Sequence, residues 1–218
     1  MRARAREADV AMVEPDDTTG PAGAAERVRL LWVNYLLSMG YSHIALAVKD
    51  MEATHRFYTE AMGFTLVKAV IVPKDGGFAR HVFYSTGSDI DQLIAFWDLS
   101  QVPGCEDIRT NISIDLGHDA YTNHLAFSAD SIEDLDVKRQ RWNDLGYDVL
   151  EIDHGWVQSI YIADPDGITV EFAVVTEPFT DADATEALEM LRVMDPALDF
   201  ALPPMKMHKT KTAVGGEG

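Results

Sequence analysis

The chain has 218 residues, enough for one ordinary domain or for two small modules that share a core, and hydrophobic residues make up 47% of it. The formal charge of −18 argues against nucleic acids and anionic membranes as partners, and no apolar run approaches the roughly 20 residues that a membrane helix needs. The single cysteine, Cys105, excludes an internal disulfide framework and favours a reducing compartment, and no secretory signal is visible. We therefore expect a soluble, cytoplasmic protein.

The first 40 residues divide into two expected segments. Residues 1–25 are rich in Ala, Asp, Thr, Gly and Pro, a composition typical of a disordered tail. Residues 26–40 carry apolar side chains at helical spacing, among them Val28, Leu31 and Leu36, and this predicts an N-terminal helix.

Residues 41–100 and 122–176 form two copies of one pattern, joined by a linker over residues 101–121. Each copy opens with a short alternating strand that begins at a histidine, His43 or His124. A stretch of helical period follows and ends at Gly63 or Gly146, the usual left-handed helix cap. Three strand-like runs complete each copy: residues 65–72, 80–85 and 92–99, then residues 148–152, 157–163 and 168–175. The sequence therefore predicts an α+β fold of two βαβββ modules that form a concave mixed sheet.

Residues 177–218 are expected to form a C-terminal helix and a tail. Thr180 is a suitable helix cap, and Asp181 and Asp183 would lie in the first turn, where the helix dipole favours negative charge. Pro203 and Pro204 are followed by basic and Gly-rich residues, which predicts a loose end of the chain.

One face of the predicted strands combines metal-ligand residues with small side chains. Side chains alternate between the faces of a strand, so His43, His124 and Glu171 share their faces with Ala, Ser and Thr, while bulky residues occupy the opposite faces. Small side chains leave volume that a ligand must fill, and a buried carboxylate such as Glu171 needs a cation beside it. This pattern predicts one divalent metal ion in an open pocket.

The paired units, their opening histidines and the Asp-Pro-Asp-Gly turn (164–167) ahead of a Val-Glu-Phe strand resemble the vicinal oxygen chelate superfamily. It includes glyoxalase I, the type I extradiol dioxygenases, methylmalonyl-CoA epimerase and bleomycin or fosfomycin resistance proteins. The resemblance covers residues 41–175 and implies metal ligands on the first and fourth strands of the modules: His43, His124 and Glu171. Ala95 aligns with the remaining ligand position, although a slip of one residue would bring Gln92 or Asp98 there.

Two histidines and one carboxylate form the pattern of non-haem Fe(II) oxygenases, which need open coordination positions. The resemblance is closest to single-domain extradiol dioxygenases. It implies Fe(II), with Mn(II), Ni(II), Zn(II) or Co(II) as alternatives, a catecholic substrate such as a dihydroxybiphenyl, O2, and a homodimer. Two other functions remain open: a glyoxalase-type metal-dependent lyase or isomerase, and a resistance protein that sequesters a small molecule.

Four further residues are candidates for proton handling. Tyr161 precedes Glu171 by the spacing at which extradiol enzymes carry a tyrosine, and His154 resembles a histidine beside their metal site. His118 lies in the segment before the second module, and His81 opens a strand of the first. Either is a candidate for the proton-handling group, because histidine is the side chain best suited to proton transfer near neutral pH. A packing role for Tyr161 and a surface position for each histidine are the alternatives. Four aromatic residues are candidates for a substrate wall or for the core: Phe83, Phe96, Trp97 and Trp156.

Overall fold

The computed structural model describes residues 41–87, 92–196 and 201–210, and the described residues from Ser42 onward belong to one compact unit. The expected N-terminal tail and helix lie outside the described residues. None of the helices in these ranges is long and apolar enough to cross a membrane.

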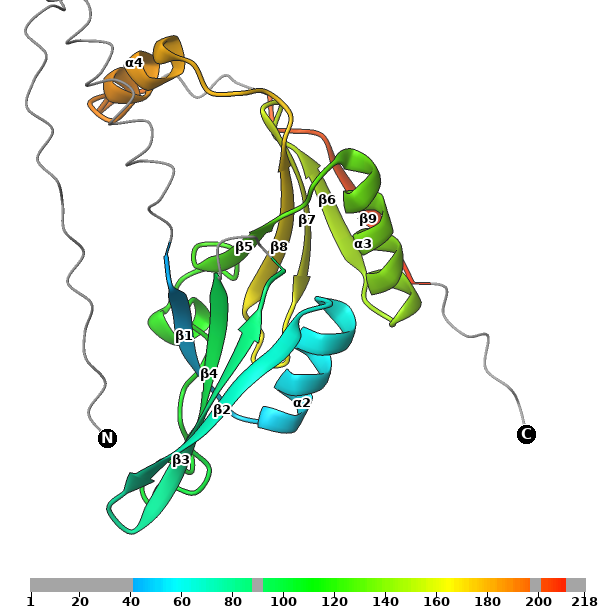
Figure 1. Ribbon diagram of the computed structural model, residues 1–218. Helices are drawn as coiled ribbons and strands as arrows, with labels where there is room; N and C mark the ends of the chain where they lie inside the picture. Colours follow the sequence, from blue (N-terminus) through cyan, green and yellow to red (C-terminus); the bar gives the residue numbers. More distant parts are fainter. Residues whose placement is uncertain (1–40, 88–91, 197–200, 211–218) are drawn as a thin grey trace, which may run out of the picture. The chain divides into compact units, whose positions relative to one another are not determined.

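The first module begins with β1 (His43–Val48), followed by helix α2 (Met51–Arg56), a π-helical turn η1 (Phe57–Ala61) and strands β2 (Thr65–Lys74), β3 (Gly77–Ser85) and β4 (Leu93–Asp98). The strands form one sheet in the order β1-β4-β3-β2, with β1 parallel to β4 (Figure 1). The side chain of Asp50 caps α2 by accepting a hydrogen bond from the amide of Ala53.

The second module repeats this arrangement with β5 (His124–Ser128), α3 (Ile132–Asp144), β6 (Val149–Asp153), β7 (Val157–Ala163) and β8 (Thr169–Val175). Its sheet has the order β5-β8-β7-β6-β9, with β5 parallel to β8 (Figure 1). A short 3-10 helix, η2 (Ile114–Leu116), lies in the linker. Two βαβββ modules are therefore present, and the predicted α+β fold is confirmed.

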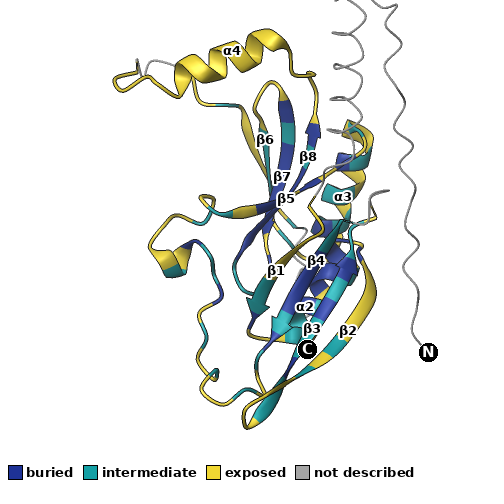
Figure 2. Cartoon of the chain, turned by 60° about the vertical axis from the view of Figure 1, so that its left-hand side comes forward, coloured by how far each residue is buried: buried dark blue, intermediate teal, exposed yellow. Residues whose placement is uncertain are grey.

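The end of the chain differs from the expectation of a loose tail. Helix α4 (Asp181–Met190) begins at the Thr180 cap as expected, and all of its residues are exposed (Figure 2). Strand β9 (Met205–His208) was not expected, and it pairs antiparallel with β6. Proline ahead of the strand does not oppose this pairing, because Pro204 still accepts a hydrogen bond from the amide of Asp153 through its carbonyl oxygen at 3.0 Å.

The helices and the bulky strand faces of both modules share one hydrophobic core. The indole of Trp142 in α3 donates a hydrogen bond to the carbonyl of Ala61 in η1 at 3.0 Å, and the rings of Phe64 and Phe127 lie 4.9 Å apart. In β5 buried residues alternate with exposed ones, so Leu125 and Phe127 enter the core while His124 faces away from it. The helices thus cover one face of each sheet and leave the histidine-bearing faces outside the core.

The Asp-Pro-Asp-Gly turn between β7 and β8 joins the second module to the first. The phenol of Tyr58 donates to Asp164 Oδ2 at 3.1 Å, and the amide of Lys49 donates to Asp166 Oδ1 at 3.1 Å. Asp164 Oδ1 also accepts from the amide of Ile168, which shapes the turn itself. Burial raises the pKa of Asp164 to about 6, and the neighbouring Asp166 adds to this effect.

Candidate metal centre

The second module brings two of the predicted ligands together. Strands β5 and β8 are neighbours, and Ala126 pairs with Glu171, so His124 lies on the same face one pleat away. His124 Nε2 is 3.1 Å from Glu171 Oε2. The Glu171 carboxylate is 6% exposed, which makes a positive partner necessary for its charge.

The imidazole of His124 is oriented for metal binding. Its Nδ1 lies 2.9 Å from the carbonyl oxygen of Tyr121, so Nδ1 carries a proton and donates it to this acceptor. The other ring nitrogen, Nε2, therefore faces Glu171. Two adjacent donors at about 2.1 Å from one ion are separated by about 3 Å, which is the separation observed here. The pair therefore fits a divalent cation.

Tyr161 and His154 lie next to this pair. Tyr161 stands directly opposite Glu171 on β7, and its hydroxyl is 3.2 Å from His154 Nε2. Burial and the adjacent Glu171 carboxylate raise the pKa of Tyr161 to about 12. The phenol is therefore protonated at neutral pH and can donate a hydrogen bond beside the two ligands.

The first module has the same strand register but no carboxylate on the corresponding face. Ala95 pairs with Ala45, as Glu171 pairs with Ala126, so the predicted alignment of Ala95 with Glu171 is confirmed. Asp98 pairs with Val48, lies on the opposite face and forms an ion pair with Arg80. The alternative register that would make Asp98 a ligand is therefore wrong.

The histidine-bearing face of the first module is rich in aromatic rings. His43 lies edge-on to Phe83 at 5.6 Å and to His81 at 6.3 Å between ring centroids, and His81 stacks on Trp97 at 3.8 Å. His81 Nε2 is buried without a hydrogen-bond partner in the described part of the chain. Burial and the neighbouring His43 lower the pKa of His81. Phe96, by contrast, is a core residue.

One chain does not bring His43 to the other two predicted ligands, His124 and Glu171. In the described ranges no group of three or more His, Cys, Asp or Glu side chains could hold a metal ion. His43 belongs to the first sheet, whereas His124 and Glu171 belong to the second. His118 lies exposed in the loop after η2. The predicted set of residues is thus divided into two half-sites, one on each sheet.

A cavity of about 280 Å³ adjoins the half-site of the second module. The sequence predicted Tyr161 and Thr169 near the site, but it did not indicate Tyr121, Leu150, Met207 and Lys209, which also line the cavity. Alternation along β6 would have identified Leu150 as well. No pattern in the sequence marks Met207, because its strand was not expected.

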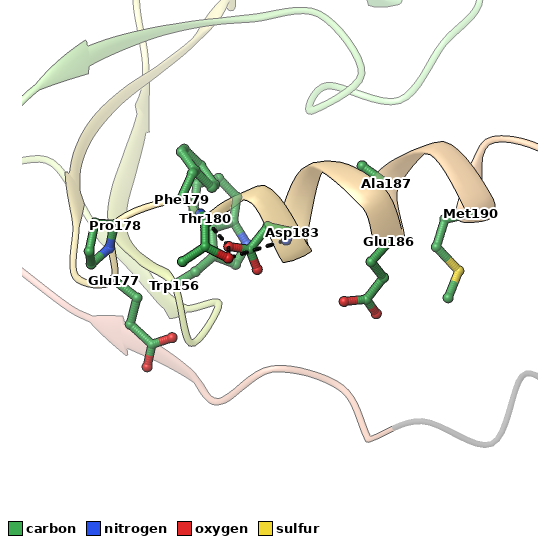
Figure 3. Close-up of a pocket in the computed structure, with 9 residues that line it drawn as sticks. All are labelled: Trp156, Glu177, Pro178, Phe179, Thr180, Asp183, Glu186, Ala187 and Met190. Carbon is green, nitrogen blue, oxygen red and sulfur yellow. Dashed lines mark hydrogen bonds between the residues drawn. The ribbon is translucent and has the colours of Figure 1, made fainter. Parts of the chain in front are cut away.

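A second cavity, of about 440 Å³, lies at the start of α4 and contains none of the predicted ligands or proton-handling residues. Figure 3 shows Phe179 and Thr180 where the helix begins, with Glu186 and Met190 farther along it. Trp156 lines this cavity and contacts Phe179, with ring centroids 5.1 Å apart. This second cavity, with Trp156 in its wall, therefore lies apart from the half-sites.

Comparisons with known proteins define the class of the protein. The model of the Glyoxalase/Bleomycin resistance protein/Dioxygenase superfamily matches residues 40–172, and the chain belongs to this family. The resemblance to the vicinal oxygen chelate superfamily is thereby confirmed. A comparison with the curated proteins finds no match.

Several solved structures are similar to the chain. A glyoxylase/bleomycin resistance protein/dioxygenase domain from Frankia sp. EAN1pec is 21% identical, with 63% of this chain and 98% of that chain covered and a TM-score of 0.47. Lactoylglutathione lyase from Agrobacterium tumefaciens is 23% identical, with 62% and 92% covered and a TM-score of 0.41. The fosfomycin resistance protein FosX from Listeria monocytogenes, in complex with Mn(II) and sulfate, is 22% identical, with 63% and 93% covered and a TM-score of 0.45. The family assignment rests on the family model and not on these likenesses.

Proposed function

We propose that the protein is a metal-dependent dioxygenase of the extradiol type, which cleaves the ring of a catecholic substrate with O2. The observation that carries this proposal is the contrast between Glu171 and Ala95 at equivalent places in the two sheets. Because the site faces of β4 and β8 offer one carboxylate between them, the ligand set is two histidines and one carboxylate. This set leaves positions on the ion open for substrate and O2.

The proposed centre is completed by a second copy of the chain. Strands β1 and β5 each pair on one side only in the described residues, and each presents its opening histidine at that edge. Free strand edges favour pairing with another chain. When β1 of a second copy meets β5, His43 of that copy joins His124 and Glu171, and two such centres form in a homodimer.

The residues around the centre have distinct roles in the proposed reaction. His43, His124 and Glu171 would hold Fe(II), which would supply electrons for the activation of O2, and Mn(II) or Co(II) are alternatives. Tyr161 donates a hydrogen bond to the substrate or oxygen, and His154 accepts or returns a proton at Nε2. Phe83 and Trp97 of the second copy provide an apolar wall for the aromatic ring.

Oxygen uptake tests the reaction. The protein is first loaded with Fe(II) without air and is then assayed in air-saturated buffer. When 2,3-dihydroxybiphenyl or catechol is added, it should consume O2 and form a yellow ring-cleavage product. Absence of turnover across a panel of catechols would exclude the dioxygenase. Turnover of a glyoxalase-type substrate without O2, with Ni(II), Co(II) or Zn(II), would assign the lyase or isomerase reaction instead. A sequestering protein would retain ligand affinity in the variant His124→Ala.

Mixing two inactive variants tests the assembly. His43→Ala and His124→Ala should each be inactive, but a mixture allowed to exchange subunits should regain activity, because each mixed dimer contains one intact centre. The matched control is a mixture of His124→Ala and Glu171→Ala. Both of these lesions fall in the same half-site, so neither centre of that mixed dimer is intact. Equal inactivity of the two mixtures would contradict a centre shared between copies.

A further inference from the structure

Strand β9 extends the sheet of the second module at the edge opposite to β5. Its two faces have different partners. His208 points toward the helix side, where it contacts Glu151 and where its carbonyl accepts a hydrogen bond from Asn143 at 3.1 Å. Since side chains alternate along a strand, Met205 and Met207 lie on the opposite face.

Strand register places Met207 in one row with the reactive groups. Ala126 pairs with Glu171, Glu171 with Tyr161, Tyr161 with Leu150, and Leu150 with Met207. Paired residues share a face of the sheet, so this row runs from the free edge at β5 to the outer edge at β9. Three strand spacings separate β8 from β9, a distance of about 14 Å along the sheet.

The cavity beside Tyr161 ends at β9. Met207 and Lys209 line it together with Leu150, and Met207 is 49% exposed. Lys209 Nζ donates to Asp148 Oδ2 at 2.7 Å, so the charged group at this end already has an ionic partner. The thioether of Met207 is consequently the apolar contact that the outer end of the cavity offers to a ligand.

We infer that β9 forms the outer wall of the substrate site and that Met207 selects catechols that carry a second apolar ring. This inference rests on the proposed function and names the substrate class for it. The diol end binds beside Glu171 and Tyr161, while the second ring reaches Leu150 and Met207 farther along the same row. Thioether sulfur makes favourable contacts with aromatic rings, and the flexible Met side chain adapts to their shape.

The test compares two ligands in the metal-loaded protein without air, using titration calorimetry. Met207→Ala should weaken binding of 2,3-dihydroxybiphenyl about tenfold and leave binding of catechol unchanged, because catechol lacks the second ring. Met207→Leu should restore most of the affinity. Lys206→Ala is the matched control, since this residue lies on the other face of the same strand and should leave both affinities unchanged.

The outcomes separate the inference from the proposed function. A loss of affinity for dihydroxybiphenyl alone in the variant Met207→Ala supports the inference, whether or not the ligand is turned over in air. Equal changes in the affinities for the two ligands, or no change in either affinity, would overturn the inference. Failure of both ligands to bind the wild-type protein would also overturn it. Binding without O2 uptake in the wild-type protein would contradict the dioxygenase reaction alone.

Discussion

At the place where β8 carries Glu171 opposite Ala126, β4 carries Ala95 opposite Ala45. The two modules therefore share a topology and a register, and they differ in the side chains that this register brings to the open face. The second module contributes a carboxylate, an imidazole and a tyrosine–histidine pair, whereas the first contributes two imidazoles, those of His43 and His81, among aromatic rings. Two modules with the same backbone topology can thus present different side chains on their open faces, polar ionisable groups on one and mainly aromatic rings on the other.

Removing the carboxylate should have the largest effect. Glu171→Gln keeps the shape of the side chain but removes the charge that a divalent ion requires, so we expect a loss of O2-dependent turnover of about a thousandfold or more. Metal analysis after gel filtration should show loss of bound iron. Glu177→Gln changes an exposed acid outside the half-site and should retain both metal and activity.

Adding a carboxylate to the first module should remove the difference between the modules. Ala95→Glu supplies a fourth donor to the proposed centre and fills an open position, so metal should be retained while ring cleavage falls about a hundredfold. Ala95→Leu adds bulk without a donor and is the matched control. If both variants lose activity equally, crowding and not ligand number is responsible, and the comparison of the two positions fails.

Removal of the Tyr161 hydroxyl should have a smaller effect on turnover. Tyr161→Phe should lower kcat by about tenfold to a hundredfold at unchanged metal content, because the hydrogen-bond donor beside Glu171 is lost. The control lies in the first module, where the hydroxyl of Tyr84 and His55 Nδ1 are 3.0 Å apart in a similar tyrosine–histidine pair. Tyr84→Phe should leave kcat unchanged. An equal loss in both variants would indicate an effect on folding.

The smallest effect concerns the turn that joins the modules. The pKa of Asp164 is raised from 3.8 to about 6 by burial, so between these values the folded state holds a proton that the unfolded state has released. The wild-type protein should therefore lose about 2 kcal/mol of stability as pH rises from about 4 to about 6, and this loss should persist above pH 6.

Asp164→Asn cannot titrate and should lack this pH dependence when unfolding in urea is measured at several pH values. Tyr58→Phe retains the carboxyl group and should retain the dependence. If Asp164→Asn and the wild-type protein show parallel curves, the buried carboxyl does not titrate in this range.

The sequence predicted the parts of the site that depend on alternation within a strand. His124 and Glu171 share a face because neighbouring parallel strands are aligned by their hydrophobic residues, and Ala95 was placed correctly for the same reason. The separation of His43 could not be predicted, since strand patterns do not state which modules meet at their edges. Strand β9 was missed because its formation depends on pairing with β6 and not on its own composition.

Among the described residues β1 and β5 each pair on one side only, and this has a consequence for the newly made protein. The proposed dimer would cover these edges, whereas a single chain exposes backbone donors and acceptors that other extended polypeptides can bind, so dimer formation would compete with aggregation. Catalytic output should then rise more steeply than the amount of protein when the protein is dilute, and expression at low level should yield disproportionately little activity. For the proposed dimer, the concentration of chains as well as the concentration of metal would therefore limit activity.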